Sequence, residues 1–191
     1  AHDVYKASKE AAAKAYRTLG KGATAAANGL AAAYDLSAEG VAQVLEGANY
    51  AAEEVAEAME NAFNLTVEAA AKVLKAAGYA AEEVGDALKS AYDASARVAA
   101  EALNHAGYAA EEVGDALKSA YNATAEVAAD ALKYAGYGVG DVGDFLQSGY
   151  GLAGDGLKTV LRGAGYAAKE VEKFLKDVGQ FFEDNLNPTK W

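Results

Sequence analysis

The residues Ala77–Tyr92, AGYAAEEVGDALKSAY, occur again without change at Ala106–Tyr121, and the two copies begin 29 residues apart. The same spacing extends over most of the chain, because an aromatic residue opens each unit at Tyr5, Tyr34, Phe63, Tyr92, Tyr121 and Tyr150. Tandem units of about 20 to 50 residues are typical of stacked supersecondary structures. The sequence therefore predicts six repeats (5–33, 34–62, 63–91, 92–120, 121–149 and 150–178) between a lead of residues 1–4 and a tail of residues 179–191.

Each repeat carries the start and stop signals of two helices. When the repeats are aligned, residues at equivalent positions form a column. One column holds Ser or Thr, with an acid two residues later in most copies, and this is typical of an N-cap followed by the first turn of a helix. Its members are Ser8, Ser37, Thr66, Ser95 and Thr124. Two further columns contain only residues that tolerate a positive φ, which indicates helix ends. They are Gly20, Asn49, Gly78, Gly107, Gly136 and Gly165, and Asp35, Asn64, Asp93, Asn122 and Gly151.

Both helices of a repeat place apolar residues on one face. Val41, Val44 and Leu45 follow the spacing i, i+3, i+4 in one helix, and Val55, Ala58 and Met59 follow it in the next. Helices this short cannot bury such a face alone, so they must stack on their neighbours. We therefore expect an all-α fold, a right- or left-wound α-solenoid of about twelve short helices. The periodicity of residues 171–182 predicts a longer closing helix. A polar side of the first helix predicts a cap for the open end of the stack, and it is formed by Lys6, Lys9, Glu10, Lys14 and Arg17.

Composition excludes several classes of protein. The chain has no Cys and a net charge of −11, so thiolate chemistry and disulfides are excluded, and clustered bases for nucleic acid are lacking. No uninterrupted apolar run reaches the ~18 residues that a transmembrane helix needs. Alanine occurs 50 times, and this amino acid favours helix and permits close helix packing.

The Gly-Tyr-Ala-Ala-Glu-Glu-Val phrase at residues 78–84 and 107–113 resembles short alanine-rich repeats of large bacterial extracellular proteins, and the whole chain resembles tandem helical-hairpin repeats. The resemblance implies an extracellular or cell-surface location. It brings no active-site motif with it, and a shared architecture does not transfer a function.

Motifs for chemistry have simpler structural explanations. Glycines at 138–143 and 149–154 satisfy G-x-G-x-x-G, but a helix rather than a strand is predicted before both. The sequons at Asn64 and Asn122 fall on helix-stop and N-cap columns. His105 is expected at a helix end, where a cation is favourable. We therefore expect no enzyme activity, no metal site and no cofactor.

Two columns remain as candidates for partner binding. The first contains the tyrosines Tyr50, Tyr79, Tyr108, Tyr137 and Tyr166, and the second contains the first-turn acids Glu53, Glu82 and Glu111. Exposed tyrosines would form rows of amphipathic contact groups, whereas the alternative is that each ring packs over its own turn. One acid per repeat would form a ladder that attracts cations or a basic partner.

The sequence thus favours a non-enzymatic, acidic structural or binding scaffold whose partner is a protein or an extracellular polymer. An alternative is self-assembly, in which the basic first repeat of one molecule stacks on the acidic middle of another to form a filament or coat. Binding to ice or to a membrane surface is a further alternative, but scattered Thr residues and an acidic middle speak against it.

Overall fold

A computed structural model describes the backbone of residues 2–185 and the side chains of residues 8–179. All regular structure in this part of the chain is helical, which confirms the predicted class. The odd-numbered helices are α1 (His2–Thr18), α3 (Ala38–Gly47), α5 (Val67–Ala77), α7 (Ala96–Ala106), α9 (Ala125–Tyr134) and α11 (Gly154–Gly163). The even-numbered helices are α2 (Ala23–Tyr34), α4 (Ala52–Phe63), α6 (Ala81–Tyr92), α8 (Ala110–Tyr121), α10 (Val139–Tyr150) and α12 (Ala168–Asn185).

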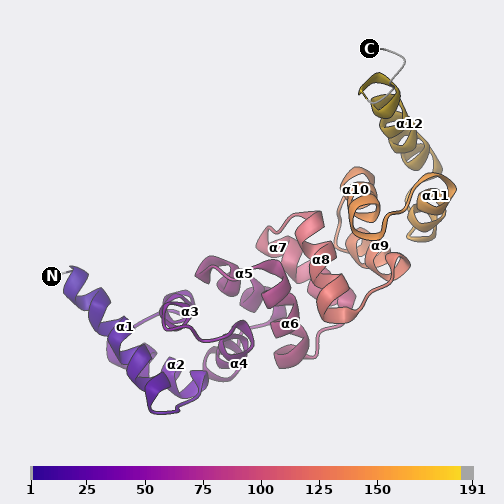
Figure 1. The fold of residues 1–191 in the computed structure, drawn as a ribbon. Coiled ribbons are helices and arrows are strands. Elements are labelled where there is room, and N and C mark those ends of the chain that lie inside the picture. The colour runs from indigo at the N-terminus through magenta and orange to yellow at the C-terminus, as the bar shows by residue number, and fades with distance from the viewer. Residues whose placement is uncertain (1, 186–191) are drawn as a thin grey trace.

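Each helix packs against the next helix in the chain and against the helix two positions along. The odd helices therefore form one layer and the even helices a second, which we call the odd layer and the even layer. Figure 1 shows the helices following one another along an elongated, bent array, with α1 and α12 at opposite ends. Contacts only between such neighbours are the arrangement of a solenoid.

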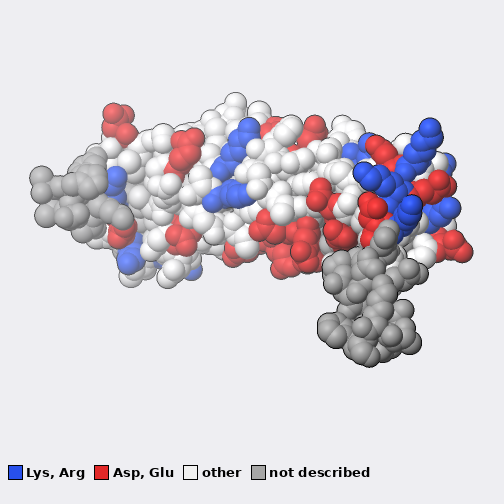
Figure 2. All heavy atoms as spheres, turned by 90° about the horizontal axis from the view of Figure 1, so that it is seen from above, with Lys and Arg blue, Asp and Glu red and all other residues white. Residues whose placement is uncertain are grey.

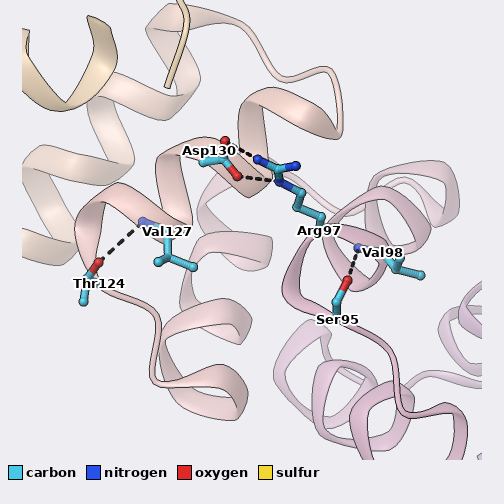
Figure 3. A network of polar contacts seen from close by, with 6 residues as sticks. All are labelled: Ser95, Arg97, Val98, Thr124, Val127 and Asp130. Carbon is cyan, nitrogen blue, oxygen red and sulfur yellow. Dashed lines mark hydrogen bonds and ion pairs between the residues drawn. The ribbon is translucent and has the colours of Figure 1, made fainter. Parts of the chain in front are cut away.

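The predicted caps are present at the repeated positions. Ser37, Thr66, Ser95 and Thr124 accept a hydrogen bond from the backbone N–H three residues later, as Figure 3 shows for Ser95 and Thr124. Both stop columns adopt positive φ, for example 52° at Asn64 and 112° at Gly78. The N–H of the residue that follows reaches back to close the turn, as Tyr79 does to the carbonyl of Leu74 at 3.2 Å.

The first helix departs from the repeat. A helix begins after Ser37, but α1 runs without a break from His2 to Thr18, so Ser8 lies inside it and residues 2–4 belong to it rather than to a lead. Lys6 stands where later repeats have Asp, Asn or Gly, and lysine does not provide the left-handed stop that separates the helices. The prediction of an N-cap at Ser8 is therefore wrong.

The core between the layers is made of few large side chains. Nearly every helix completely buries at least one Leu or Met; among them are Leu30, Leu45, Met59, Leu74, Leu88, Leu103, Leu117, Leu132, Leu146 and Leu161. Most other buried residues are alanines, and no polar or charged residue is buried among the described side chains. Alanine lets neighbouring helices approach closely, so a thin supply of large aliphatic residues is sufficient.

Glycines in the even layer make room for two phenylalanines. A Cβ on Gly85 would lie 3.2 Å from the Cβ of Ala116, whereas a Cβ on Gly114 would overlap the ring of Phe145. A Cβ on Gly143 would overlap the ring of Phe174 in the same way. These interior glycines therefore permit close contact between even helices, and two of them receive a ring from the next even helix.

The last repeat closes the array. One column is fully buried at Ala42, Ala71, Ala100 and Ala129 but holds Lys158 in α11. A second buried column, which includes Gly114 and Gly143, holds Glu172 in α12. The side chains of Lys158 and Glu172 are 44% and 63% exposed, and they form an ion pair at 3.8 Å. Charges on these faces oppose the packing of a further helix because burial would remove them from water.

The closing helix is longer than the others, as the sequence predicts, since α12 extends to Asn185. The rest of the predicted tail, including Pro188 and Trp191, lies outside the described residues, as do the side chains of Phe181 and Phe182.

We predict that Gly114→Ala destabilises the protein by about 1 to 3 kcal/mol, because the new Cβ forces the buried Phe145 ring out of its packing. The matched control is Gly140→Ala in α10, where a Cβ meets nothing within 4 Å. This change is expected to stabilise by up to about 1 kcal/mol, the ordinary result for Gly to Ala in a helix. Urea denaturation measures both.

The same Gly114→Ala change in a Phe145→Ala background is expected to lose its cost, because the clash has been removed. Equal destabilisation in both backgrounds would show that the glycine is needed for another reason.

Candidate functional site

The predicted tyrosine row lies at the turn between the two helices of each repeat. The N–H of each tyrosine closes the preceding helix. The side chains of Tyr50, Tyr79, Tyr108 and Tyr166 are buried, and that of Tyr137 is partly buried. Their hydroxyls, however, are engaged by the protein itself. Each donates a hydrogen bond to a backbone carbonyl one repeat earlier, and we call this series the tyrosine ladder.

The ladder repeats along the array from Tyr50 to Tyr166. The hydroxyl of Tyr79 lies 2.7 Å from the carbonyl oxygen of Tyr50, and that of Tyr108 lies 2.6 Å from the carbonyl oxygen of Tyr79. Tyr137 and Tyr166 continue the series at 2.6 and 2.8 Å. Tyr50 donates at 3.2 Å to the carbonyl of Lys21, the residue that replaces tyrosine in the first repeat. The backbone can serve as acceptor whatever side chain stands there.

Basic side chains cover ladder rings from the previous repeat. The Lys75 Nζ lies 4.1 Å from the centre of the Tyr108 ring, and Lys133 lies 5.1 Å from that of Tyr166. The guanidinium of Arg17 lies 5.2 Å from the Tyr50 ring and also donates to the carbonyl of Asn49. Part of the predicted polar face of the first helix therefore covers the next repeat, through a cation–π contact.

Burial changes the acid–base behaviour of the ladder. Removal of the phenol from water raises the pKa of Tyr108 to about 12, and the nearby Glu112 and Glu83 act in the same direction. Burial likewise raises the pKa values of Tyr79, Tyr137 and Tyr166 above the ordinary value of 10.0. These tyrosines hold neighbouring repeats together in the neutral form. A role for them in binding a partner stays a prediction, and their burial argues against it.

The second candidate column is exposed. Glu53, Glu82 and Glu111 lie in the first turns of α4, α6 and α8, with their side chains in solvent. The acid that follows each of them has a structural role, because it accepts a hydrogen bond from the N–H of the residue before the helix. These acceptors are Glu54, Glu83 and Glu112, at 2.9, 2.9 and 2.7 Å. The paired acids therefore divide their roles, one capping the helix and one facing solvent.

The exposed acids line two hollows between successive even helices. A hollow of about 360 Å³ between α4 and α6 is bordered by Glu53, Glu54, Glu57 and Glu60, with Asn61 and Ser90. A second, of about 310 Å³, lies between α8 and α10 and is bordered by Glu111, Asp141 and Asp144. No ion pair engages any of these acids among the described side chains.

Charge is divided unequally between the two layers. Helices α4, α6, α8 and α10 contain twelve acidic and two basic residues, a net charge of −10. Helices α5, α7, α9 and α11 contain five acidic and six basic residues, a net charge of +1. The twelve acids of the even helices include Asp86, Asp115 and Asp144, which lie one turn beyond the first-turn acids. Figure 2 shows acidic side chains gathered along one edge of the middle of the molecule.

The sequence analysis missed this asymmetry because it contrasted a basic first repeat with an acidic middle along the chain and did not compare alternate helices. A count by alternate helices would have found it, since the helix boundaries are visible in the cap columns. The acids at Glu57, Glu60, Asp141 and Asp144 would then have been grouped with Glu53 and Glu111.

The other motifs have the structural roles expected of them. Gly138 and Gly140 lie at the start of α10, directly after the turn that ends α9, and no strand precedes them. Within the described residues, no group of three or more potential metal-ligating side chains forms a site. In the same part of the chain, no helix has both the length and the apolar character needed to span a membrane.

Comparison of the chain with protein families, with curated proteins and with solved structures finds no match. The resemblance to alanine-rich bacterial repeats therefore rests on the repeated phrase alone, while the helical-repeat architecture rests on the structure.

We predict opposite effects for two tyrosine to phenylalanine changes. Tyr108→Phe removes a buried hydrogen bond and is expected to cost about 1 kcal/mol. The hydroxyl of Tyr121 is buried without a hydrogen-bond partner, so Tyr121→Phe is expected to be neutral or stabilising by up to about 1 kcal/mol. Urea denaturation of both variants tests the ladder, and equal destabilisation would contradict it.

We predict that alkaline pH unfolds the array. Because the folded-state pKa of Tyr108 is raised from 10.0 to about 12, its contribution to stability is complete below pH 10 and is lost as pH rises toward 12. The other buried ladder tyrosines act in the same direction. Tyrosinate absorbance is expected to rise together with the loss of helical circular dichroism. Ionisation of the buried tyrosines while the helices remain intact would contradict the ladder.

Proposed function

We propose that this chain is a non-enzymatic scaffold whose even layer binds a basic protein or polymer. The observation that supports the proposal most strongly is the net charge of −10 on α4, α6, α8 and α10, with all of their acids except the partly buried Asp115 exposed along consecutive repeats. A regular row of one sign of charge attracts an oppositely charged chain and raises its rate of association.

The spacing of the acids suits an extended partner. Glu53, Glu82 and Glu111 occupy the same position in three successive repeats, so a basic chain that follows the array meets the same group at each step. The hollows between α4 and α6 and between α8 and α10 add further carboxylates at the same layer. Exposed pairs are individually weak, so many similar contacts are needed for appreciable affinity.

The lining of the hollows supports binding rather than catalysis. Carboxylates, small side chains, one Phe and the hydroxyls of Ser90 or Ser148 border them, and neither hollow contains a histidine. Nucleophilic catalysis by a hydroxyl requires an adjacent base that is oriented by a third group, and neither hollow brings such a set together. An extracellular or cell-surface location, indicated by the sequence resemblance, is part of the same proposal.

End-to-end assembly into a filament receives less support. The faces of α11 and α12 on which another repeat would pack carry Lys158 and Glu172, paired with each other. At the other end, Tyr16 of α1 covers Gly29 of α2, where even helices elsewhere receive their neighbour. Because the faces at both ends of the array are covered in this way, a partner is expected to bind along its length and not at its ends.

The test is the binding of a fluorescent oligolysine peptide, followed by anisotropy. The variant E53Q/E82Q/E111Q removes three even-layer charges. At about 0.3 kcal/mol for each exposed pair, it is expected to weaken binding by roughly fivefold at low salt. The control variant E39Q/E68Q/E126Q removes the same charge from the odd layer and is expected to weaken binding much less. Binding should also fall as salt increases.

Equal weakening by the two triple variants would show that the peptide responds only to net charge, and it would overturn the assignment to the even layer. Failure of the wild-type protein to bind oligolysine at low salt would overturn the proposed function. Circular dichroism of each variant confirms that the helices are intact.

A further inference from the structure

Two repeats carry an acceptor sequence for asparagine-linked glycans at the turn between an even helix and the next odd helix. Asn64-Leu65-Thr66 follows α4, and Asn122-Ala123-Thr124 follows α8. Asparagine followed two residues later by Ser or Thr, with no proline between them, is the sequence to which glycans are transferred. The fold explains each residue type separately, because the asparagine ends one helix and the threonine caps the next. It does not require the two together.

The same turn forms in the repeats that lack asparagine. Asp93 and Asn122, in successive repeats, both have a φ of 50°. The hydroxyls of Ser95 and Thr124 cap the next helix at the same distance, 3.5 Å, as Figure 3 shows. From the turn after α2 to the turn after α8, asparagine is paired with threonine and aspartate with serine. Threonine is the better acceptor residue of the two, so this pairing favours modification of the two asparagines.

The side chains of Asn64 and Asn122 are exposed and take no part in holding the fold. The turn at Asn64 is held by the backbone, whose N–H donates to the carbonyl oxygen of Glu60 at 2.8 Å. Among the described side chains, no hydrogen bond or ion pair engages either carboxamide. A glycan on the Nδ2 atom therefore displaces no contact of the folded chain.

The two acceptors lie at the ends of the even helices that are remote from the tyrosine ladder. Tyr50 precedes α4 and Asn64 ends it, so Asn64 lies roughly 16 Å along the axis from Glu53 at 1.5 Å per residue. Helix α6 separates α4 from α8, which places the two acceptors roughly 20 Å apart at the usual spacing of packed helices. Two bulky glycans therefore have room, and the first-turn acids stay uncovered.

We propose that Asn64 and Asn122 are asparagine-linked glycosylation sites, and that the donor is an oligosaccharide carried on a polyprenyl pyrophosphate. The transfer joins C1 of the first sugar to the Nδ2 atom and breaks the bond between C1 and the pyrophosphate oxygen. The amide loses one proton, and the lipid pyrophosphate leaves. The inference rests on the extracellular location that is part of the proposed function, and it holds whatever the even layer binds.

The modification precedes completion of the fold. In the folded turn Asn64 is held at a φ of 52°, and the Thr66 hydroxyl accepts a hydrogen bond from the N–H of Ala69. The transferring enzyme needs this segment open, with both side chains accessible. Because helices this short depend on their neighbours, the segment stays open until the next repeat has been made.

The test is to secrete the full chain from cultured animal cells behind a cleavable signal and to measure its intact mass before and after treatment with peptide N-glycosidase. The wild type is expected to carry two glycans, both released by the enzyme. Release converts each asparagine to aspartate, the residue that Asp35 and Asp93 supply in other repeats. The helical circular dichroism is therefore expected to be the same before and after release.

Three variants locate the glycans. N64D/N122D introduces the residue of the neighbouring repeats, so it is expected to fold and to carry no glycan. D93N/S95T places the same acceptor sequence in the turn between α6 and α7, and it is expected to carry three. The control N49D also removes an exposed asparagine at a positive φ, 61°, but neither Ser nor Thr follows two residues later. It is expected to keep two glycans.

A wild-type chain with fewer than two glycans would overturn the proposal. Sugar that is still released from N64D/N122D, or the absence of a third glycan on D93N/S95T, would show that this turn is not the acceptor. Loss of helical circular dichroism in the glycosylated protein would show that the fold does not carry glycans at these positions. Oligolysine binding is measured separately on protein without glycans, so failure of the proposed function is distinguishable from failure of this inference.

Discussion

Close packing between each helix and its neighbour in the same layer is the constraint on which the structure depends. Helices of ten to twelve residues, such as α3 and α4, are marginal alone, and within the described part of the chain each one contacts only helices one or two positions away. The alanine and glycine columns let the backbones approach. The tyrosine ladder then fixes the step from one repeat to the next, because a hydroxyl at each turn must reach the carbonyl 29 residues earlier.

Local signals were readable from the sequence because each depends on a few adjacent residues. Ser or Thr at an N-cap and Gly, Asn or Asp at a positive φ have the same meaning in any helix, and from the second repeat onward the structure has them where they were predicted. Where a local signal changes, the repeat pattern alone gave a wrong prediction. Lys6 replaces the helix stop of later repeats, and the structure has one long helix where an N-cap at Ser8 was predicted.

Contacts between repeats were harder to predict, because they depend on the distance between turns in space. The sequence shows that Tyr108 and Tyr79 are equivalent, but not that the hydroxyl of one reaches the backbone of the other. The same holds for Lys75 over the Tyr108 ring, a contact between residues in different repeats. The charge asymmetry was present in the sequence and needed only a count by alternate helices.

Each repeat has columns that hold the array together and columns that face solvent. Columns that face the core or the next repeat contain Ala, Gly, Leu and Tyr, and they change where the array closes at Lys158 and Glu172. Columns that face solvent are free to vary. At these positions the even helices carry acids, whereas α7 and α9 carry large apolar side chains. We infer that interactions with other molecules depend on these solvent-facing columns.

Native-state hydrogen exchange of the wild-type protein tests the central claim that contacts between adjacent repeats hold the array together. If each repeat is stabilised by its neighbours on both sides, amide protection is highest in the middle helices α5 to α8 and declines toward both ends. Protection that is equal in every repeat, or lower in the middle than at the ends, would show that single repeats are stable by themselves and would contradict the account.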